Sequence, residues 1–141
     1  MIQPSIWSNL HGASTHFPIA LMLVSAFCEV AARLRFREEW RGEFQAAARV
    51  TLILGALGSY LAVLTGLVTA KWQVWGHATL LRHHQFVWPA FALMTGLATW
   101  RVLGRGSLSG RGAAIYLVLM LLTSALIGLA GYWGGEMLNQ G

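Results

Sequence analysis

The residues of this sequence that could do chemistry are its histidines, and two pairs of them stand beside long apolar runs. His11 and His16 lie in "HGASTHFPIALML", and His83 and His84 lie in "RHHQFVWPAFALM". Imidazole is the commonest side-chain ligand of metals in proteins, haem iron included. The fifth histidine, His77, is seven residues before His84, so the two share a face of any helix that begins early enough. The function therefore depends on whether the fold brings these rings together.

The composition indicates a membrane protein. Of the 141 residues 56% are hydrophobic and only 11% are charged, whereas soluble domains carry about 25% charged residues. A membrane-crossing helix needs roughly 20 apolar residues, and four segments are long enough, with no Asp, Lys or Arg in their cores. We therefore predict an all-α fold, an integral membrane four-helix bundle in which residues 1–141 form a single domain. The predicted spans are about residues 13–33, 47–70, 83–101 and 112–135.

The positions of the basic residues predict the orientation of the bundle. Arginines flank the first and third loops, whereas only Lys71 and Arg82 flank the second loop, and the terminal tails have none. Because cytoplasmic loops carry an excess of Lys and Arg, we expect both termini to face outward. The net charge of +5 is thus a sign of topology, and nucleic acid is not a predicted partner. The arginines that flank the first and third loops are Arg33, Arg35, Arg37, Arg41, Arg49, Arg101, Arg105 and Arg111.

His16 and His84 are predicted to lie at the same depth in the membrane. Each precedes an arginine at the inner end of its helix by 17 residues (16 to 33 and 84 to 101). At 1.5 Å per residue, both lie roughly 25 Å from the inner boundary, near the outer edge of the hydrocarbon. Pro18 is best tolerated in a first turn, which places the start of the first helix near Thr15 to Phe17. The dipole at that helix N-terminus would keep the ring of His16 neutral, as a metal requires of its ligand.

We interpret the two histidines as axial ligands of one haem b, His16 from the first helix and His84 from the third. His11, His83 and His77 are further candidate ligands. Positions 83 and 84 differ by about 100° around a helix, so the sequence does not decide which of them is the partner of His16. Small residues on the second and fourth spans admit either close helix packing or a flat ring. The residues predicted at the outer edge, where haem propionates would emerge, are Lys71, Trp72, Trp75 and Arg82.

Other residues suggest supporting roles. Glu29 lies four residues before Arg33, a spacing that favours an ion pair at the inner interface. Glu136, in "GYWGGEML", is a candidate to orient a ligand histidine by accepting its second N–H. Cys28 is the one cysteine and there is no C-x-x-C-H motif, which excludes a disulfide and covalently attached haem within this chain. No nucleophile–base pair, paired carboxylates or phosphate loop is present, so the sequence does not predict an enzyme.

Several motifs resemble those of the DUF2231 family of predicted four-helix bacterial membrane proteins. They are "HGASTHFPIALML" followed by Glu29, "LTGLVTAKW" at residues 64–72, and "GYWGGEML" at residues 131–138. The resemblance implies that His11, His16 and His84 are the shared histidines. Because some members are joined to c-type cytochrome modules, it also implies a redox role. The chain departs from the pattern at Gly12, where proline is common, and at Tyr132 and Trp133, where some members have a histidine.

The sequence thus predicts a membrane-bound, b-type cytochrome-like electron-transfer subunit of the bacterial inner membrane, with its haem near the outer face. The expected partners are membrane lipid and other membrane or periplasmic redox subunits, and quinone is a further candidate without a specific motif. Two alternatives remain open. One is a non-redox anchor or assembly subunit of a larger respiratory complex, and the other is a membrane protein that binds a metal through its histidine cluster.

Overall fold

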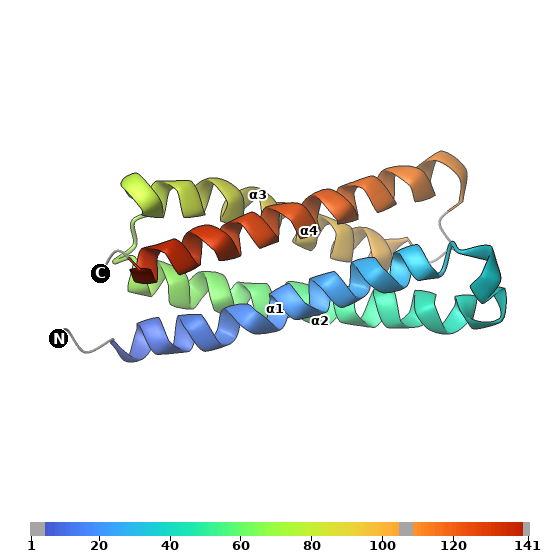
Figure 1. Ribbon diagram of the computed structural model, residues 1–141, viewed down its shortest axis with the longest axis horizontal. Helices are drawn as coiled ribbons and strands as arrows, with labels where there is room; N and C mark the ends of the chain where they lie inside the picture. The colour runs from blue at the N-terminus through green and yellow to red at the C-terminus, as the bar shows by residue number, and fades with distance from the viewer. Residues whose placement is uncertain (1–4, 105–108, 140–141) are drawn as a thin grey trace.

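The described part of the chain is all-helical. The computed structural model describes residues 5–104 and 109–139, which form four α-helices and one short 3-10 helix (Figure 1). In chain order the elements are α1 (Ile6–Ala31), η1 (Arg35–Trp40), α2 (Arg41–Thr69), α3 (Ala78–Leu103) and α4 (Gly110–Asn139).

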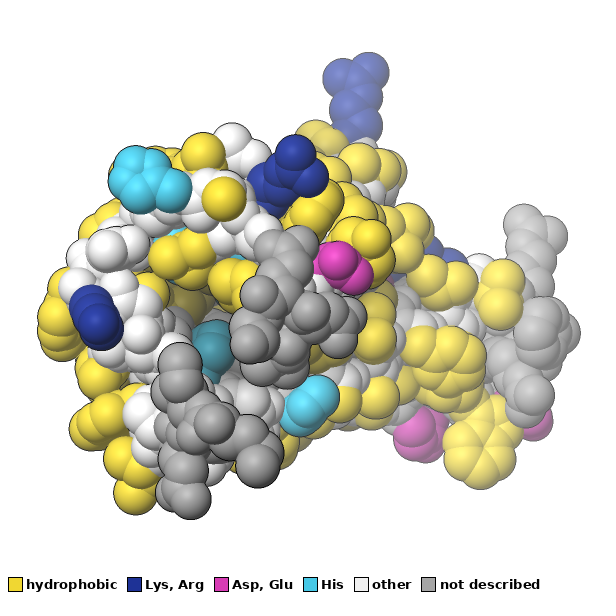
Figure 2. Space-filling model, turned by 60° about the vertical axis from the view of Figure 1, so that its left-hand side comes forward, with side chains coloured by type: hydrophobic (Ala, Val, Ile, Leu, Met, Phe, Trp, Pro, Cys, Tyr) yellow, Lys and Arg dark blue, Asp and Glu magenta, His cyan; other side chains and the backbone are white. Residues whose placement is uncertain are grey.

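The four α-helices are each long and apolar enough to cross a membrane. The candidate spans are Ile6–Ala31, Glu38–Thr69, Ala78–Leu103 and Gly110–Met137. Each overlaps one predicted span, so the predicted all-α class with four membrane helices is confirmed. Large apolar side chains also cover much of the outer surface, as the yellow area of Figure 2 shows. Such a surface is favourable in lipid and unusual on a soluble monomer.

The helices are arranged as two hairpins. α1 packs mainly against α2, and α3 mainly against α4, with fewer contacts between the two pairs. The N-terminus, the C-terminus and the α2–α3 loop lie at one end of the bundle (left in Figure 1). η1, the end of α3 and the start of α4 lie at the other end, which is the end rich in arginine. The predicted placement of the histidines and most arginines at opposite ends is therefore confirmed.

Small residues on α2 let α1 approach closely. A Cβ atom at Gly55 would lie 3.3 Å from the Cβ atom of Leu21, and one at Gly58 would lie 2.8 Å from Cδ1 of Phe17. At these positions the small-residue pattern of the second span serves helix packing. Between the hairpins, large side chains fill the core nearer the arginine-rich end. Its fully buried members are Met22, Leu52, Met94, Leu97, Tyr116, Met120 and Thr123, each under 2% exposed.

The predicted start of the first helix, near residues 15–17, is wrong. α1 begins at Ile6, where the Ser5 hydroxyl caps the helix by accepting the backbone N–H three residues on, at 3.2 Å. Pro18 lies inside the helix. Membrane helices tolerate interior proline because neighbouring groups can satisfy the freed backbone carbonyl. His16 therefore lies in the helix interior, and the helix dipole does not account for the state of its ring.

Candidate functional site

A cavity of about 760 Å³ lies between the two hairpins, at the end that holds the chain termini. All four α-helices contribute to its walls. Figure 2 looks toward this end and shows the hollow, with a histidine side chain inside it. Its volume is in the range of small-molecule and cofactor sites, and most of its lining is apolar, as in such sites. Apolar lining residues include Val63, Leu67, Val87, Phe91, Met94 and Ile127.

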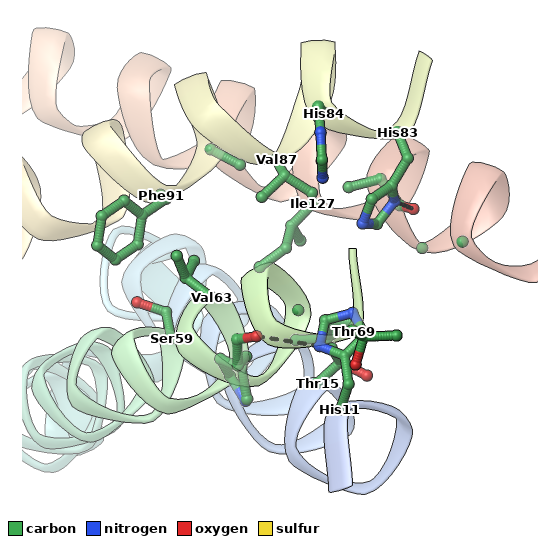
Figure 3. A pocket seen from close by; sticks show the side chains of 18 of the residues that line it. His11, Thr15, Ser59, Val63, Thr69, His83, His84, Val87, Phe91 and Ile127 are labelled. Carbon is green, nitrogen blue, oxygen red and sulfur yellow. Dashed lines mark hydrogen bonds between the residues drawn. The ribbon is translucent and has the colours of Figure 1, made fainter. Parts of the chain in front are cut away.

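Three histidines from two helices line this cavity in well-packed positions. His11 comes from α1, and His83 and His84 come from successive positions of α3 (Figure 3). His84 is the most buried of them, with 6% of its surface exposed. The rings of His83 and His84 lie 5.7 Å apart, centre to centre. The fold thus brings histidines of the first and third helices to one site.

Each of these three rings is oriented by the same kind of hydrogen bond, in which Nδ1 donates to a backbone carbonyl. The acceptors are the carbonyl oxygens of Ala62 for His11 (3.0 Å), Ala130 for His83 (2.8 Å) and Trp75 for His84 (3.2 Å). Because a carbonyl oxygen only accepts, the hydrogen must sit on Nδ1. In the neutral ring Nε2 then carries the free lone pair, which is the state of a metal-ligating imidazole.

A glycine makes room for one of the rings. A Cβ atom at Gly66 of α2 would lie 2.8 Å from Cε1 of His11. Glycine is therefore required at position 66, where the imidazole of His11 packs against α2 and binds the carbonyl of Ala62. The sequence places Gly66 in a small-residue pattern, but its role beside a histidine depends on a contact between residues 55 positions apart.

The other two histidines are arranged differently. His16 lines the same cavity as His84, but its side chain is exposed. His77 is the exposed residue just before α3 and does not line the cavity. The pairing of His16 with His84 stays a prediction. Among first-helix histidines, His11 is the one whose ring is held by a carbonyl.

The residues predicted to receive the propionates belong to the α2–α3 loop and the first turns of α3. Lys71 and Trp75 are exposed, and neither lines the cavity. The guanidinium carbon of Arg82 lies 4.8 Å from the centre of the Trp133 ring, a cation–π contact with α4. Lys71 and Arg82 thus lie at the predicted end of the bundle, but neither of them lines the cavity.

Two other features considered for this site are a metal ion held by protein side chains alone and a histidine oriented by Glu136. Residues 5–104 and 109–139 contain no group of three His, Cys, Asp or Glu side chains that could hold a metal ion on their own. The orienting role considered for Glu136 is filled by backbone carbonyls at His11, His83 and His84. The metal-ligating side chains that line the cavity are the imidazoles of His11, His16, His83 and His84 and the thioethers of Met94 and Met137; imidazole and thioether are both ligands of haem iron.

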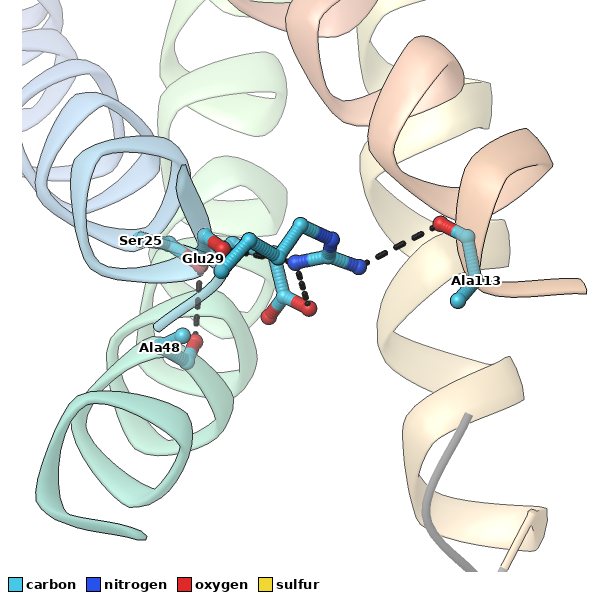
Figure 4. Close-up of polar contacts among 5 residues, drawn as sticks. Ser25, Glu29, Ala48 and Ala113 are labelled. Carbon is cyan, nitrogen blue, oxygen red and sulfur yellow. Dashed lines mark hydrogen bonds and ion pairs between the residues drawn. The ribbon is translucent and has the colours of Figure 1, made fainter. Parts of the chain in front are cut away.

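A second buried polar group lies at the opposite end of the bundle (Figure 4). Glu29 is 3% exposed, and Arg33 Nη1 donates to its Oε1 at 2.6 Å, which confirms the ion pair predicted from their spacing. Arg33 Nη2 also donates to the carbonyl of Ala113 in α4, at 3.3 Å. Ser25 donates to the carbonyl of Ala48 in α2, at 2.7 Å. These bonds connect α1 and the turn that follows it to α2 and α4 near the arginine-rich end.

Comparison with known families gives one match. The family model described as "Predicted membrane protein (DUF2231)" matches residues 8–140, which is nearly the whole chain. No curated protein and no solved structure matches. The family description adds no activity, substrate or cofactor to the geometry described above.

The substitution Gly66→Ala tests the orientation of His11. Alanine is up to about 1 kcal/mol more favourable than glycine in a helix, so Gly128→Ala, where a Cβ meets nothing within 4 Å, should be neutral or stabilising. Gly66→Ala should instead lower the free energy of unfolding by about 1 kcal/mol, because it displaces the ring and breaks its hydrogen bond. Unfolding of the detergent-solubilised protein, followed by circular dichroism, measures both. Equal stability of the two variants would contradict the close contact.

Arg33→Ala tests the buried ion pair. Removing the guanidinium leaves the Glu29 carboxylate buried without its partner, so we expect a loss of about 3 kcal/mol in the free energy of unfolding. The double variant Glu29→Gln/Arg33→Ala should recover part of that loss, because no buried charge remains. The same denaturation assay applies. If the double variant were as unstable as Arg33→Ala, the loss would come from the bond to Ala113 and not from the charge.

Proposed function

Since the chain belongs to the DUF2231 family of predicted membrane proteins, we propose that it is a cytochrome-like electron-transfer subunit that holds one haem b between its two hairpins. The observation that carries the proposal is the set of three imidazoles whose Nδ1–H groups are bound to carbonyls beside one cofactor-sized cavity. Haem supplies a one-electron redox couple at its iron when it is bound. The protein supplies the ligands, their orientation and the surrounding polarity.

In this proposal His11 from α1 and His84 from α3 would hold the haem iron. His11 is oriented by Ala62 and fitted against Gly66. His84 is the most buried imidazole and is oriented by Trp75. A carbonyl that accepts from Nδ1 fixes the tautomer of the ring and raises the basicity of Nε2 as a ligand. The remaining candidates on the two helices, His16 and His83, line the same cavity and are the variants to compare.

The lining of the cavity supports a redox cofactor over a hydrolytic site. Apolar residues from all four helices surround the space beside the imidazoles. The polar hydroxyls that line it, such as those of Ser59 and Thr15, donate to carbonyls of their own helices, Ala56 and Gly12. Burial and low polarity are among the properties by which a protein sets a haem potential. Electrons would be exchanged at the open end, with membrane-bound or periplasmic redox proteins, or with quinone, as partners.

The cavity end is proposed to face the outside of the bacterial inner membrane. The arginine-rich connections at the opposite end correspond to cytoplasmic loops under the positive-inside rule. Lys71 and Arg82 at the cavity end are then the minority of basic residues that such a topology tolerates. This orientation would place the haem near the outer face, within reach of periplasmic partners.

A visible difference spectrum tests the proposed cofactor. Protein expressed with ample haem and purified in detergent should show sharp low-spin b-type bands in the reduced-minus-oxidised spectrum. His11→Ala and His84→Ala should each remove the low-spin bands and lower the bound haem about tenfold or more, because an axial ligand is lost. His77→Ala is the matched control outside the cavity and should match the wild-type spectrum.

Other outcomes of that series are equally informative. Loss of the bands in His16→Ala but not in His11→Ala would assign the first-helix ligand to His16. Loss in His83→Ala but not in His84→Ala would assign the neighbouring ring of α3. A flat spectrum from the wild-type protein would reject the haem proposal and favour the anchor or assembly role.

Cysteine labelling tests the orientation. In a Cys28→Ala background, Ile6→Cys marks the cavity end and Ser109→Cys marks the opposite end, since both positions are exposed. A membrane-impermeant maleimide added to cells with a permeabilised outer membrane should label the variant at position 6 and spare the variant at position 109. Labelling of position 109 alone would show that the bundle is inserted the other way round.

A further inference from the structure

The loop between α2 and α3 is held by two side chains that α3 presents to it. Trp88 Nε1 donates to the carbonyl of Val74 at 2.8 Å. His84 Nδ1 donates to the next carbonyl, that of Trp75, at 3.2 Å. Two consecutive peptide carbonyls of one loop are thus bound by two residues that both line the cavity.

The backbone around these carbonyls adopts an unfavourable conformation. Lys71, Trp72 and Ala78 have φ angles of 52°, 63° and 50°, in the left-handed region that residues with a side chain rarely adopt. Such strain persists only where surrounding contacts maintain it. The N–H groups of Lys71 and Trp72 donate to carbonyls at the end of α2, those of Val68 and Leu67. The part of the loop's path that carries the Val74 and Trp75 carbonyls is instead bound by side chains of α3.

Trp88 is well placed to maintain that path. It follows His84 by four residues, so the two side chains are neighbours on one face of α3. Their ring centres are 6.0 Å apart. The indole N–H fixes one peptide unit of the loop, and the adjoining peptide unit then presents its oxygen to the imidazole.

We infer that Trp88 is a positioning residue for His84: by binding the Val74 carbonyl it places the Trp75 carbonyl that fixes the His84 tautomer with Nε2 free. This inference rests on the proposed function for its redox consequence, but the tautomer itself is a property of the haem-free protein. A weaker bond at Nδ1 would make the imidazole a poorer electron donor to iron, and the ferric state would lose stabilisation.

Trp88→Phe tests the inference, because it keeps an aromatic ring and removes only the indole N–H group. In the haem-loaded protein, the variant should bind as much haem as wild type but have a more positive midpoint potential. Its ferric low-spin electron paramagnetic resonance signal should also shift, since the ligand is held less firmly. Trp7→Phe is the matched control, because Trp7 is an exposed tryptophan of α1 that does not line the cavity.

A second measurement separates this inference from the haem proposal. In haem-free protein labelled with ¹⁵N at histidine, the His84 ring, assigned through His84→Ala, should show a single tautomer with the proton on Nδ1. In Trp88→Phe the His84 resonances should move toward a mixture of tautomers, and in Trp7→Phe they should not. If wild type takes up no haem, the proposed function fails, and these resonances still decide the role of Trp88.

Three results would overturn the inference. An unchanged midpoint potential in Trp88→Phe would show that the indole has no influence on the haem ligand. Unchanged His84 resonances would show that the loop holds its path without Trp88. Loss of helical circular dichroism in Trp88→Phe would show that Trp88 is a structural core residue and not a positioning residue.

Discussion

Packing between the two hairpins near the arginine-rich end is the constraint on which the site depends. In a bilayer the hydrophobic effect does not drive helices together, so close packing and polar bonds must do so. Fully buried methionines from three helices, Met22, Met94 and Met120, fill this region. Arg33, in the turn after α1, adds a bond to α4. Because the hairpins are joined there, they can enclose a cavity at the other end without coming apart.

The cavity in turn depends on how imidazoles can be oriented inside an apolar bundle. A buried carboxylate beside each ring would be costly at membrane depth. The chain instead uses backbone carbonyls, two of which, those of Ala62 and Ala130, lie within α2 and α4. A carbonyl oxygen has two lone pairs, so it can keep its helical bond and accept a second hydrogen. The helices that form the walls therefore also act as the orienting groups.

Much of this fold follows from the sequence. Composition predicts a membrane protein with four helices. The spacing between the histidines and the arginines predicts that the two groups lie at opposite ends of the bundle. The i, i+4 spacing of Glu29 and Arg33 predicts their ion pair, because Glu29 lies in the last turn of α1 and Arg33 directly follows its C-cap. These features depend on local spacing or on overall composition, which a single sequence displays directly.

The parts that could not be predicted depend on contacts between distant segments. The start of α1 was expected near Pro18 because soluble helices place proline in their first turn, whereas the structure continues the helix back to Ile6. The carbonyl partners of His11 and His83 lie 51 and 47 residues away in the chain. No periodicity in the sequence shows which helix carbonyl will face which ring.

Orientation of the rings by the folded backbone also bears on how a ligand would bind. A binding site loses affinity when side chains must be ordered on binding, and pre-organised sites avoid that cost. Here His11 is fixed by α2 and Gly66, and His84 is fixed by the α2–α3 loop. A planar ligand entering between the hairpins would therefore meet imidazoles whose free nitrogens are already defined.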